Sequence, residues 1–422
     1  MKVVYDPRHL ELLPGINTLQ FTISTVADSL SVDYSTVFDE LPSEPFYFLL
    51  DINYVADKQG PGEIVIVTEH SESIKALQQF LIPEEVISRV VCGSAMILLS
   101  RPYHGFPIEV LDKLVAMITE LHSHIAPLQR SQFVFMLPAT GKKFVPYLNI
   151  VDFTFFERMV GERRHEDNKN RIWQHRVKAI DSYEVPRHRF VCTNRRSNVF
   201  RMACTTSLWD LRDRGILTLL QDPNDLSSGG YNQEPMLHNY FPELYDTFVT
   251  EIKPQLPLIW DVGFGLELSP TECIAPDHDD FLSAMLDSAL CIVNETLMAD
   301  QPPQWHSEKT YKSISLMMPF IIVGQRHSLR TLRDQGYKTF DPWINESYDS
   351  IADPKDRLRA SMAEARRIIE MSDGDIATLL RDIQPVLVHN FRHFHKRYDN
   401  FDSDAVDKLQ AILDKWTVAF SQ

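Results

Sequence analysis

The chain lacks three features that would assign it to a class of protein at once: a long apolar run, a pattern of cysteines and a surplus of basic residues. No segment approaches the roughly 18 consecutive apolar residues that a membrane-spanning helix needs, and the first residues lack the apolar core of a signal peptide. Acidic side chains number 58 against 42 lysines and arginines, a net charge of −16. We therefore expect a cytoplasmic protein with no membrane span and no general affinity for nucleic acid or anionic lipid.

Cysteine is scattered as well as scarce. None of the five cysteines shows the CxxC or Cys/His spacing of a zinc site, so we expect reduced thiols in the core and no structural metal. What the chain does have is length and a globular composition: 422 residues, of which 44% are hydrophobic and 24% charged. That length accommodates two domains, each with its own core.

Residues 46–137 alternate compact apolar runs with the helical patterns Ser73–Phe80 and Pro107–Ile125. Continuous apolar strands separated by helices are typical of a sheet covered on both faces. We therefore predict a first α/β domain over residues 1–185. The apolar runs interpreted as strands are Phe46–Leu50, Ile64–Val67, Val90–Val91 with Ala95–Leu99, and Phe133–Leu137.

Polar side chains that follow two of these strands are the candidate catalytic residues. Asp51 follows the first apolar run, and Glu69 and His70 follow the second. In open α/β sheets ligands bind beyond the carboxyl ends of the strands, and a carboxylate or imidazole there can act as a general base. A turn or capping role is the alternative interpretation of each residue.

Between Arg163 and Arg201 the composition becomes basic, with eleven lysines and arginines against four acidic residues. We expect an acidic protein that gathers its cations in one stretch to hold them near an anion, although solvated helix faces explain Arg163–Lys178 equally well. Glu184-Val185-Pro186 is typical of a linker before a new strand. We therefore predict a second domain over residues 186–400, with its boundary at Pro186.

The second domain begins with an arrangement suited to anions. The strand Phe190–Thr193 ends in Asn194-Arg195-Arg196, just before a helix predicted over Val199–Arg214. Guanidinium groups bind phosphate through paired hydrogen bonds, and the free N–H groups of a helix start add to such a site. Arg201 in the first turn is a further candidate. Later elements expected in this domain are a strand at Leu256–Trp260 and a helix over Phe281–Leu290 that leads into Cys291-Ile292-Val293.

A strand–helix–strand unit follows. Val293-Asn294-Glu295-Thr296 ends a strand, Ser307-Glu308-Lys309 starts a helix, and Met318–Gly324 forms the next strand. A helix start carries unpaired N–H groups and a partial positive charge, so Lys309 there adds to a site for phosphate, while Glu308 can accept hydrogen bonds from sugar hydroxyls. An ordinary helix capped by Ser307 is the alternative.

The rest of the chain is predicted to be helical. A polar turn at Asp399–Asp402 is expected to separate the last two helices, and the segment 401–422 is expected to return to the first domain. The predicted helices are Ser328–Gln335, Lys355–Met371, Gly374–Tyr398 and Ser403–Phe420.

Over residues 186–360 the chain resembles the carboxyl half of GT-B glycosyltransferases, in particular fucosyltransferase-like proteins and related transferases, many of them from tailed phages. It departs from the fucosyltransferase form in having Asn294-Glu295-Thr296 in place of Glu-Asn-Ser, and in a longer insert, Leu297–Gln304. The motifs that carry the resemblance, in order and in approximate spacing, are Phe190–Arg201, Val293–Thr296, Ser307–Thr310, Pro319–Gly324 and Gly336–Phe340.

The resemblance implies two Rossmann-like α/β domains facing a cleft, with C-terminal helices packing back toward the first domain. It implies that Glu308 and Lys309 contact the ribose and phosphates of a nucleotide-sugar, and that Arg195 or Arg196 contacts the diphosphate. No cofactor or metal is expected, so the protein itself would supply positive charge to the departing diphosphate. The candidate donor-binding residues are Asn194, Arg195, Arg196, Arg201, Glu295, Thr296, Ser307, Glu308 and Lys309.

The predicted activity is transfer of a sugar to an acceptor hydroxyl, with inversion as the resemblance implies. The acceptor is either a glycan or small molecule, or a hydroxymethylated base in DNA, which the phage relatives and the basic segment favour. A nucleotide-binding or structural protein with the same fold and no catalysis is the alternative from a different class. The sequence predicts no oligomeric state.

Three other clusters have simpler structural interpretations. Asp277-His278-Asp279-Asp280 has the Asp-x-Asp spacing that holds a metal in transferases of another fold, but acidic residues before a helix also cap it and favour its dipole. His389 and His393 lie four positions apart without the Glu of a zinc-binding helix, and Ser227–Gly230 lacks the strand and the Lys of a phosphate loop. We expect no metal at these positions.

Overall fold

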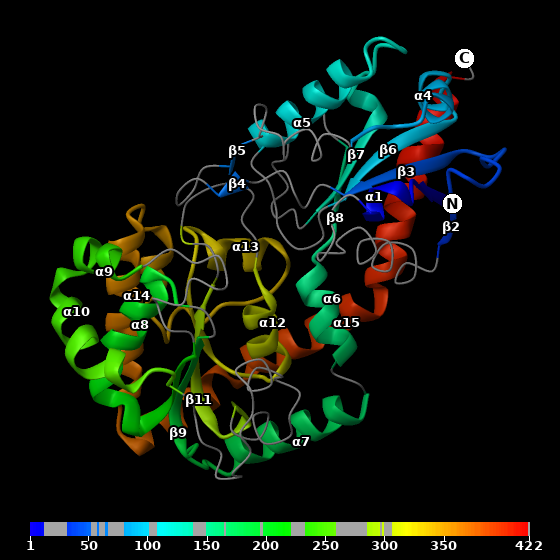
Figure 1. Cartoon of the computed structure of the whole chain (residues 1–422). Coiled ribbons are helices and arrows are strands. Elements are labelled where there is room, and N and C mark those ends of the chain that lie inside the picture. The colour runs from blue at the N-terminus through cyan, green and yellow to red at the C-terminus, as the bar shows by residue number, and fades with distance from the viewer. Residues whose placement is uncertain are drawn as a thin grey trace. The chain divides into compact units, whose positions relative to one another are not determined.

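The structure, a computed structural model, divides into two compact units (Figure 1). The first comprises Met1–Arg158, Gln301–Trp305 and Arg397–Gln422, and the second comprises Met159–Asp300 and His306–Lys396. No helix in the described part of the chain is long and apolar enough to cross a membrane. The residues that the structure describes are 1–11, 32–51, 57–58, 64–65, 80–100, 108–137, 149–163, 166–194, 197–220, 233–258, 285–295, 298 and 306–420.

The first unit is built on a six-stranded sheet in the order β2-β1-β3-β6-β7-β8, and every pairing in it is parallel. All residues of β6 and β7 are buried, which accounts for their unbroken apolar sequence. The strands are β1 (Lys2–Tyr5), β2 (Asp33–Thr36), β3 (Phe46–Asp51), β6 (Ala95–Ser100), β7 (Phe133–Leu137) and β8 (Asn149–Asp152), with a separate antiparallel pair, β4 (Asp57–Lys58) and β5 (Ile64–Val65).

Helices α4 and α5 supply the core that covers this sheet. In α5, Leu111, Leu114 and Ile118 recur at the spacing of one helical face and are fully buried. The prediction of Val90–Val91 as strand residues is wrong, because Val90 joins the core from the last turn of α4 while Val91 is 38% exposed. The further helices that begin in this unit are α1 (Arg8–Glu11), α4 (Glu84–Val91), α5 (Ile108–Leu121), η2 (Arg130–Gln132) and α6 (Phe155–Arg163).

The final part of α15 (Asp373–Phe420) belongs to the first unit. Figure 1 draws α15 as one unbroken helix, so the turn predicted at Asp399–Asp402 is wrong. Asp402 accepts a hydrogen bond from Arg158 Nε at 2.8 Å, and the hydroxyl group of Tyr47 on β3 donates to Leu409 O at 2.7 Å. These contacts hold the helix against the six-stranded sheet.

The second unit has a four-stranded parallel sheet in the order β10-β9-β11-β12. The helix predicted over Phe281–Leu290 is wrong at its end, because Ser288, Ala289 and Leu290 already belong to β11 and pair with β9. Leu258, in the strand predicted at Leu256–Trp260, forms only an isolated antiparallel bridge to Leu219. The strands are β9 (His188–Asn194), β10 (Gly215–Leu219), β11 (Ser288–Asn294) and β12 (Phe320–Val323).

The second unit contains several short helices and the first part of α15. The predicted helices at Ser328–Gln335 and Lys355–Met371 are confirmed as α13 and α14. The elements of this unit are α7 (Glu166–Asp181), α8 (Val199–Ser207), η3 (Trp209–Arg214), α9 (Glu234–Tyr240), α10 (Pro242–Thr247), η5 (Phe248–Ile252), η6 (Lys253–Gln255), α12 (Glu308–Ser315), α13 (Ser328–Asp334), η7 (Glu346–Ser350), α14 (Pro354–Ile369) and the first part of α15.

Helix α7 joins the second unit through a buried arginine. Arg176 is 2% exposed and donates to the backbone carbonyl oxygens of Met285, Ser288 and Leu316 at 3.1 to 3.3 Å. Burial lowers the pKa of its guanidinium group to about 10. The chain therefore divides after Arg158, ahead of α7, whereas we had predicted a boundary near Pro186.

Candidate functional site

Each sheet reverses its strand order beside its first strand, and such reversals are where open α/β sheets bind ligands. In the first unit the chain adds β2 on one side of β1 and β3 on the other, and in the second it adds β10 on one side of β9 and β11 on the other. The strands next to the second reversal end at Asn194 and Asn294. These two side chains are in contact.

Asn194 and Asn294 lie at the centre of a buried polar network. Asn294 Nδ2 donates to Asn194 Oδ1 at 3.0 Å, and Asn194 Nδ2 donates to Thr205 Oγ1 of α8 at 3.4 Å. The two asparagines are 1% and 2% exposed, and Asn294 Oδ1 has no hydrogen-bond partner among the described residues. Because an unpaired buried acceptor is costly, this oxygen marks a position where a ligand could donate a hydrogen bond.

The start of α12 is occupied by a side chain of the protein itself. Glu295 is 5% exposed, and its carboxylate accepts the backbone N–H of Ser307 at 3.1 and 3.2 Å and the hydroxyl group of Thr310 at 2.6 Å. Ser307 caps the helix, with its Oγ accepting Lys309 N–H at 3.4 Å. The capping interpretation of Ser307 is therefore confirmed, and its N–H is already bonded to a carboxylate.

Glu308 and Lys309 form an ion pair in the first turn of α12. Lys309 Nζ donates to Glu308 Oε1 at 2.8 Å, and the two side chains are 23% and 25% exposed. Burial raises the pKa of Glu308, but the charges of Lys309 and Lys312 outweigh it and lower that pKa to about 2. Glu308 is therefore ionised at neutral pH, and an incoming phosphate would compete with it for Lys309.

Helix α8 begins directly after the strand end at Asn194. Asn198 caps it, accepting the backbone N–H of Arg201 at 2.9 Å. Arg201 is only 5% exposed, so this predicted donor-binding residue lies largely within the unit. Sequence reasoning named Arg201 but not the cap, although Asn before an apolar helical run is a standard cap signal.

Several predicted residues fall outside the described part of the chain. Asp51 ends β3 at the carboxyl edge of the first sheet, and its side chain is not described. The catalytic and donor-binding roles assigned to these positions stay predictions. The predicted site residues outside the described ranges are Glu69, His70, Arg195, Arg196 and Thr296.

Part of the basic segment is used to hold the second unit together. Arg176 donates to backbone carbonyl groups, as described above, and Arg189 on β9 forms an ion pair with Asp373 at the start of α15. The backbone N–H of Arg187 donates to Asp287 Oδ1 at 3.0 Å. The guanidinium groups of Arg176 and Arg189 therefore have structural partners, whereas Arg187 is held through its backbone.

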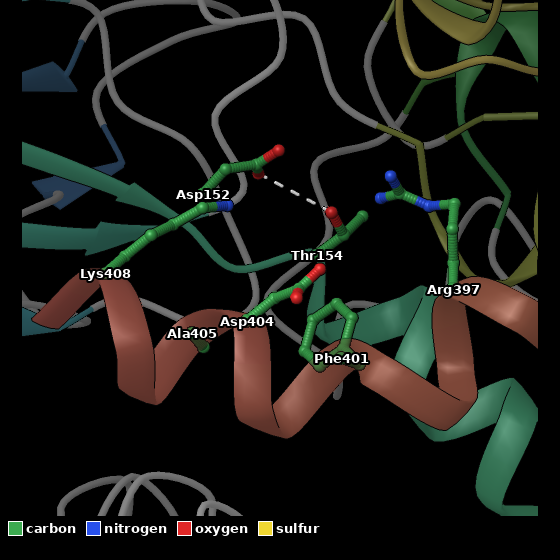
Figure 2. Close-up of a pocket in the computed structure, with 7 residues that line it drawn as sticks. All are labelled: Asp152, Thr154, Arg397, Phe401, Asp404, Ala405 and Lys408. Carbon is green, nitrogen blue, oxygen red and sulfur yellow. Dashed lines mark hydrogen bonds between the residues drawn. The ribbon is translucent and has the colours of Figure 1, made fainter.

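A polar pocket of about 70 Å³ lies in the first unit at the carboxyl end of β8 (Figure 2). Thr154 Oγ1 donates to Asp152 Oδ1 at 3.5 Å, and one face of α15 lies opposite them. Arg397 is fixed by Glu157, a fully buried carboxylate that accepts from its Nε and Nη2 at 2.6 and 2.9 Å. The lining residues are Asp152, Thr154, Arg397, Phe401, Asp404, Ala405 and Lys408.

Sequence reasoning missed this pocket. Asp152 carried the same signal as Asp51, a carboxylate at the end of a strand, but β8 has only four residues and one fully buried position. Arg397 carried no signal, because its partner Glu157 lies 240 positions away.

The histidines of the predicted cluster on α15, His389 and His393, are bonded to the protein backbone. His393 Nε2 donates to Gln335 O at 2.9 Å and His389 Nε2 donates to Gly336 O at 3.0 Å, so both rings attach α15 to the segment after α13. No group of three or more His, Cys, Asp or Glu side chains that could hold a metal occurs among the described residues. Asp277–Asp280 and Ser227–Gly230 lie outside them.

Comparisons of the chain with protein-family models, with curated proteins and with solved structures find no match. The class of fold is given by the topology itself, which is α/β with two parallel, Rossmann-like sheets of six and four strands. The resemblance to GT-B transferases rests on the sequence motifs alone.

Proposed function

We propose that the protein is a glycosyltransferase of the GT-B type, whose second unit binds a nucleotide-sugar where the strand order reverses between β9 and β11. The observation that carries the proposal is the contact of Asn194 with Asn294 at that reversal. The Asn294 Oδ1 atom accepts no hydrogen bond from any described residue. A ribose hydroxyl or an amino group of the base could donate to this oxygen. Lys309 also supports the proposal. It lies in the first turn of α12, and its ammonium group can bind a phosphate.

In the proposed reaction the acceptor hydroxyl attacks the anomeric carbon, and the bond from that carbon to the diphosphate oxygen breaks with inversion. The hydroxyl proton passes to a carboxylate or imidazole base, for which Asp51, Glu69 and His70 stay the predicted candidates. The diphosphate leaves with added negative charge, and cationic side chains of the second unit stabilise it.

The contacts of Glu295 change which groups would bind the diphosphate. Because the Ser307 N–H is bonded to the Glu295 carboxylate, the backbone of α12 offers less to a phosphate than an empty helix start would. Binding of the diphosphate would depend on side chains. Lys309 would break its ion pair with Glu308 and bind the phosphate in its place. Arg195 and Arg196, which follow β9, are the other cations proposed for this role.

A glycan or small-molecule acceptor has more support than DNA. Arg176 and Arg189 in the basic segment are engaged within the second unit, which removes part of the reason for a nucleic-acid surface. Binding to a hydroxymethylated duplex should fall steeply as salt rises, because neutralised phosphates release counterions. A weak, salt-independent interaction with such a duplex would exclude DNA as the acceptor.

Calorimetry with a panel of nucleoside diphosphates tests the donor site. We expect one of them to bind, and Lys309→Ala to weaken it at least fivefold, the low end for loss of a charged hydrogen bond of about 1 kcal/mol. Lys355→Ala is the matched control, since Lys355 is an exposed lysine of the same unit paired with Asp353. Affinity should be unchanged in the control.

Equal affinity in wild type and Lys309→Ala would reject the assignment of the donor site. Catalysis is tested separately by release of nucleoside diphosphate from nucleotide-sugars in the presence of a chelator, since water can replace the acceptor. Binding without any turnover of donor would favour the non-catalytic alternative.

A further inference from the structure

A groove of about 970 Å³ lies in the second unit, after the carboxyl end of β12. His327 and α13 line one part of it, and the segment from Tyr337 through η7 lines another. That segment includes Tyr337–Phe340, a motif to which the resemblance gave no role. Ligand sites in proteins span roughly 300–1,000 Å³, so the groove suits a molecule of the size of a sugar phosphate or a nucleotide.

The carboxylates of the groove are already bonded to protein donors. Asp349 is 6% exposed, and its oxygens accept the backbone N–H groups of Leu329 and Arg330 at 2.9 and 3.2 Å. Glu346 accepts from the side chains of Arg333 and Thr339 at 2.9 and 2.7 Å. Burial raises the pKa of both carboxyl groups, so neither is a ready partner for a further cation.

Two of the three cations that line the groove have available side chains. Arg330 and Lys338 are exposed, and neither side chain has a hydrogen bond or an ion pair with any residue that the structure describes. Asp341 is the exposed carboxylate among the described lining residues. The lining as a whole has three cations and three carboxylates, and Arg330 and Lys338 are the two cations whose side chains no described residue pairs.

The backbone that carries these side chains is held in place without a ligand. Asn390 of α15 is 2% exposed, and its side-chain amide forms two hydrogen bonds with the backbone of Lys338. Its Oδ1 accepts the Lys338 N–H and its Nδ2 donates to the Lys338 carbonyl oxygen, each at 2.8 Å. The half-buried Trp343 is fixed through its backbone, which donates to Phe340 O and accepts from Arg367. Binding would therefore require little ordering of this backbone, and the ordering cost would fall on the side chains of Arg330 and Lys338.

We propose that this groove binds a phosphorylated small molecule, with its phosphate held by Arg330 and Lys338 and its ring placed against Trp343. Guanidinium and ammonium groups form the strongest hydrogen bonds to phosphate oxygens. A half-buried indole offers a flat apolar surface to a sugar or base. None of the residues proposed for the nucleotide-sugar lines the groove, so this is a second site.

The test is a titration of the full-length protein with ribose 5-phosphate, inorganic pyrophosphate and ribose at constant ionic strength, followed by tryptophan fluorescence and calorimetry. We expect both phosphorylated probes to bind and ribose not to bind. The combined variant Arg330→Ala and Lys338→Ala should bind at least tenfold more weakly, while Arg381→Ala, an exposed arginine outside the groove, should bind as wild type does. Trp343→Phe should remove the fluorescence change that ribose 5-phosphate causes.

Affinity that is unchanged in the combined variant, or absent for both phosphorylated probes, overturns the proposal. Lys309→Ala separates it from the donor site, because that variant should lose affinity for the nucleoside diphosphate and keep its affinity for ribose 5-phosphate. Either site can therefore fail the tests while the other passes.

Discussion

The buried side chain of Arg357 joins three separate segments of the second unit. It is 1% exposed, and its guanidinium group donates to the carbonyl oxygens of Gly324 at 2.9 Å, Met298 at 2.6 Å and Ala352 at 3.1 Å, as well as to Ile351. It thus ties the residue after β12 to the start of α14 and to Met298, which lies beyond the end of β11. Two of these segments adjoin the proposed donor site.

Arg357→Leu should lower the free energy of unfolding by about 3 kcal/mol or more, because it leaves several buried carbonyl groups without a donor. Arg359→Leu is the matched control on the same helix. Arg359 is 42% exposed and pairs with Glu243, so its loss should cost less than about 1 kcal/mol. Urea unfolding of both variants checks this, and equal losses would contradict it.

His395 gives a prediction for pH. It is 5% exposed and packs against Phe391 and Phe394, and burial, followed by the charge of Lys169, lowers its pKa to about 4. In the unfolded chain an imidazole binds its proton near pH 6.5. Stability from this residue is therefore present above pH 6.5 and is lost as the pH falls to 4, by up to about 3 kcal/mol.

His395→Leu should flatten the dependence of stability on pH in that window. The measurement is the midpoint of urea unfolding at several values between pH 4 and 7, in wild type and in the variant. A variant whose midpoint falls as steeply as that of wild type would show that another group is responsible.

At the scale of residues, the sequence predicted which residues end a strand or cap a helix, but not which side chains contact one another. Asn194 and Ser307 were found because a strand end and a helix start leave local signals. The contact of Asn194 with Asn294 spans 100 positions, and no local pattern encodes it. Glu295 was predicted to bind the donor, yet its described contacts are with Ser307 and Thr310, which only the folded chain brings to it.

At the scale of elements, α15 shows where local propensity fails. The polar run at Asp399–Asp402 predicted a turn, since Asn and Asp are weak helix formers by a few tenths of a kcal/mol each. In the structure Asp402 pairs with Arg158, and the ring of Phe401 lies 5.0 Å from that of Phe153. These long-range contacts outweigh the small local cost, and the helix continues.

The pair of Glu157 and Arg397 should be the most sensitive point of the contact between α6 and α15. Arg397→Leu leaves the fully buried Glu157 carboxylate without this partner and should cost about 3–5 kcal/mol. Replacing both residues with Leu should cost less than replacing Arg397 alone, because no buried charge then remains. Chemical unfolding of the single and double variants measures the difference, and a double variant less stable than the single one would contradict the account.

At the scale of the whole molecule, the class of fold was predictable and the division of the chain was not. Runs such as Phe46–Leu50 and Phe133–Leu137 are apolar without interruption, which only a sheet buried on both faces requires, and the parallel α/β prediction is confirmed. Where the chain divides depends on contacts such as those of Arg176 with Met285 and Ser288, which link segments about a hundred positions apart.

Thiol reactivity reports on the integrity of both units. Cys92 is exposed, whereas Cys192, Cys204 and Cys291 are buried, and burial raises the pKa of the Cys291 thiol to about 11. Cys273 lies outside the described residues, so the experiment uses a Cys273→Ser background. With a thiol-specific reagent at neutral pH, we expect a fast phase in that background that Cys92→Ser removes. The three buried thiols should react only as fast as the protein unfolds. A fast phase that persists in Cys92→Ser at the size of three further thiols would show that the second sheet opens in the native state.

The hydrogen bond from Tyr47 to Leu409 has a consequence for the order in which the chain is made. Its two residues are 362 positions apart, so β3 leaves the ribosome long before the helix that covers it. Domains usually fold from the N-terminus as they are synthesised. The first unit instead has to wait until all of the second has been translated, and during that time the apolar surface around Tyr47 is open to chaperones.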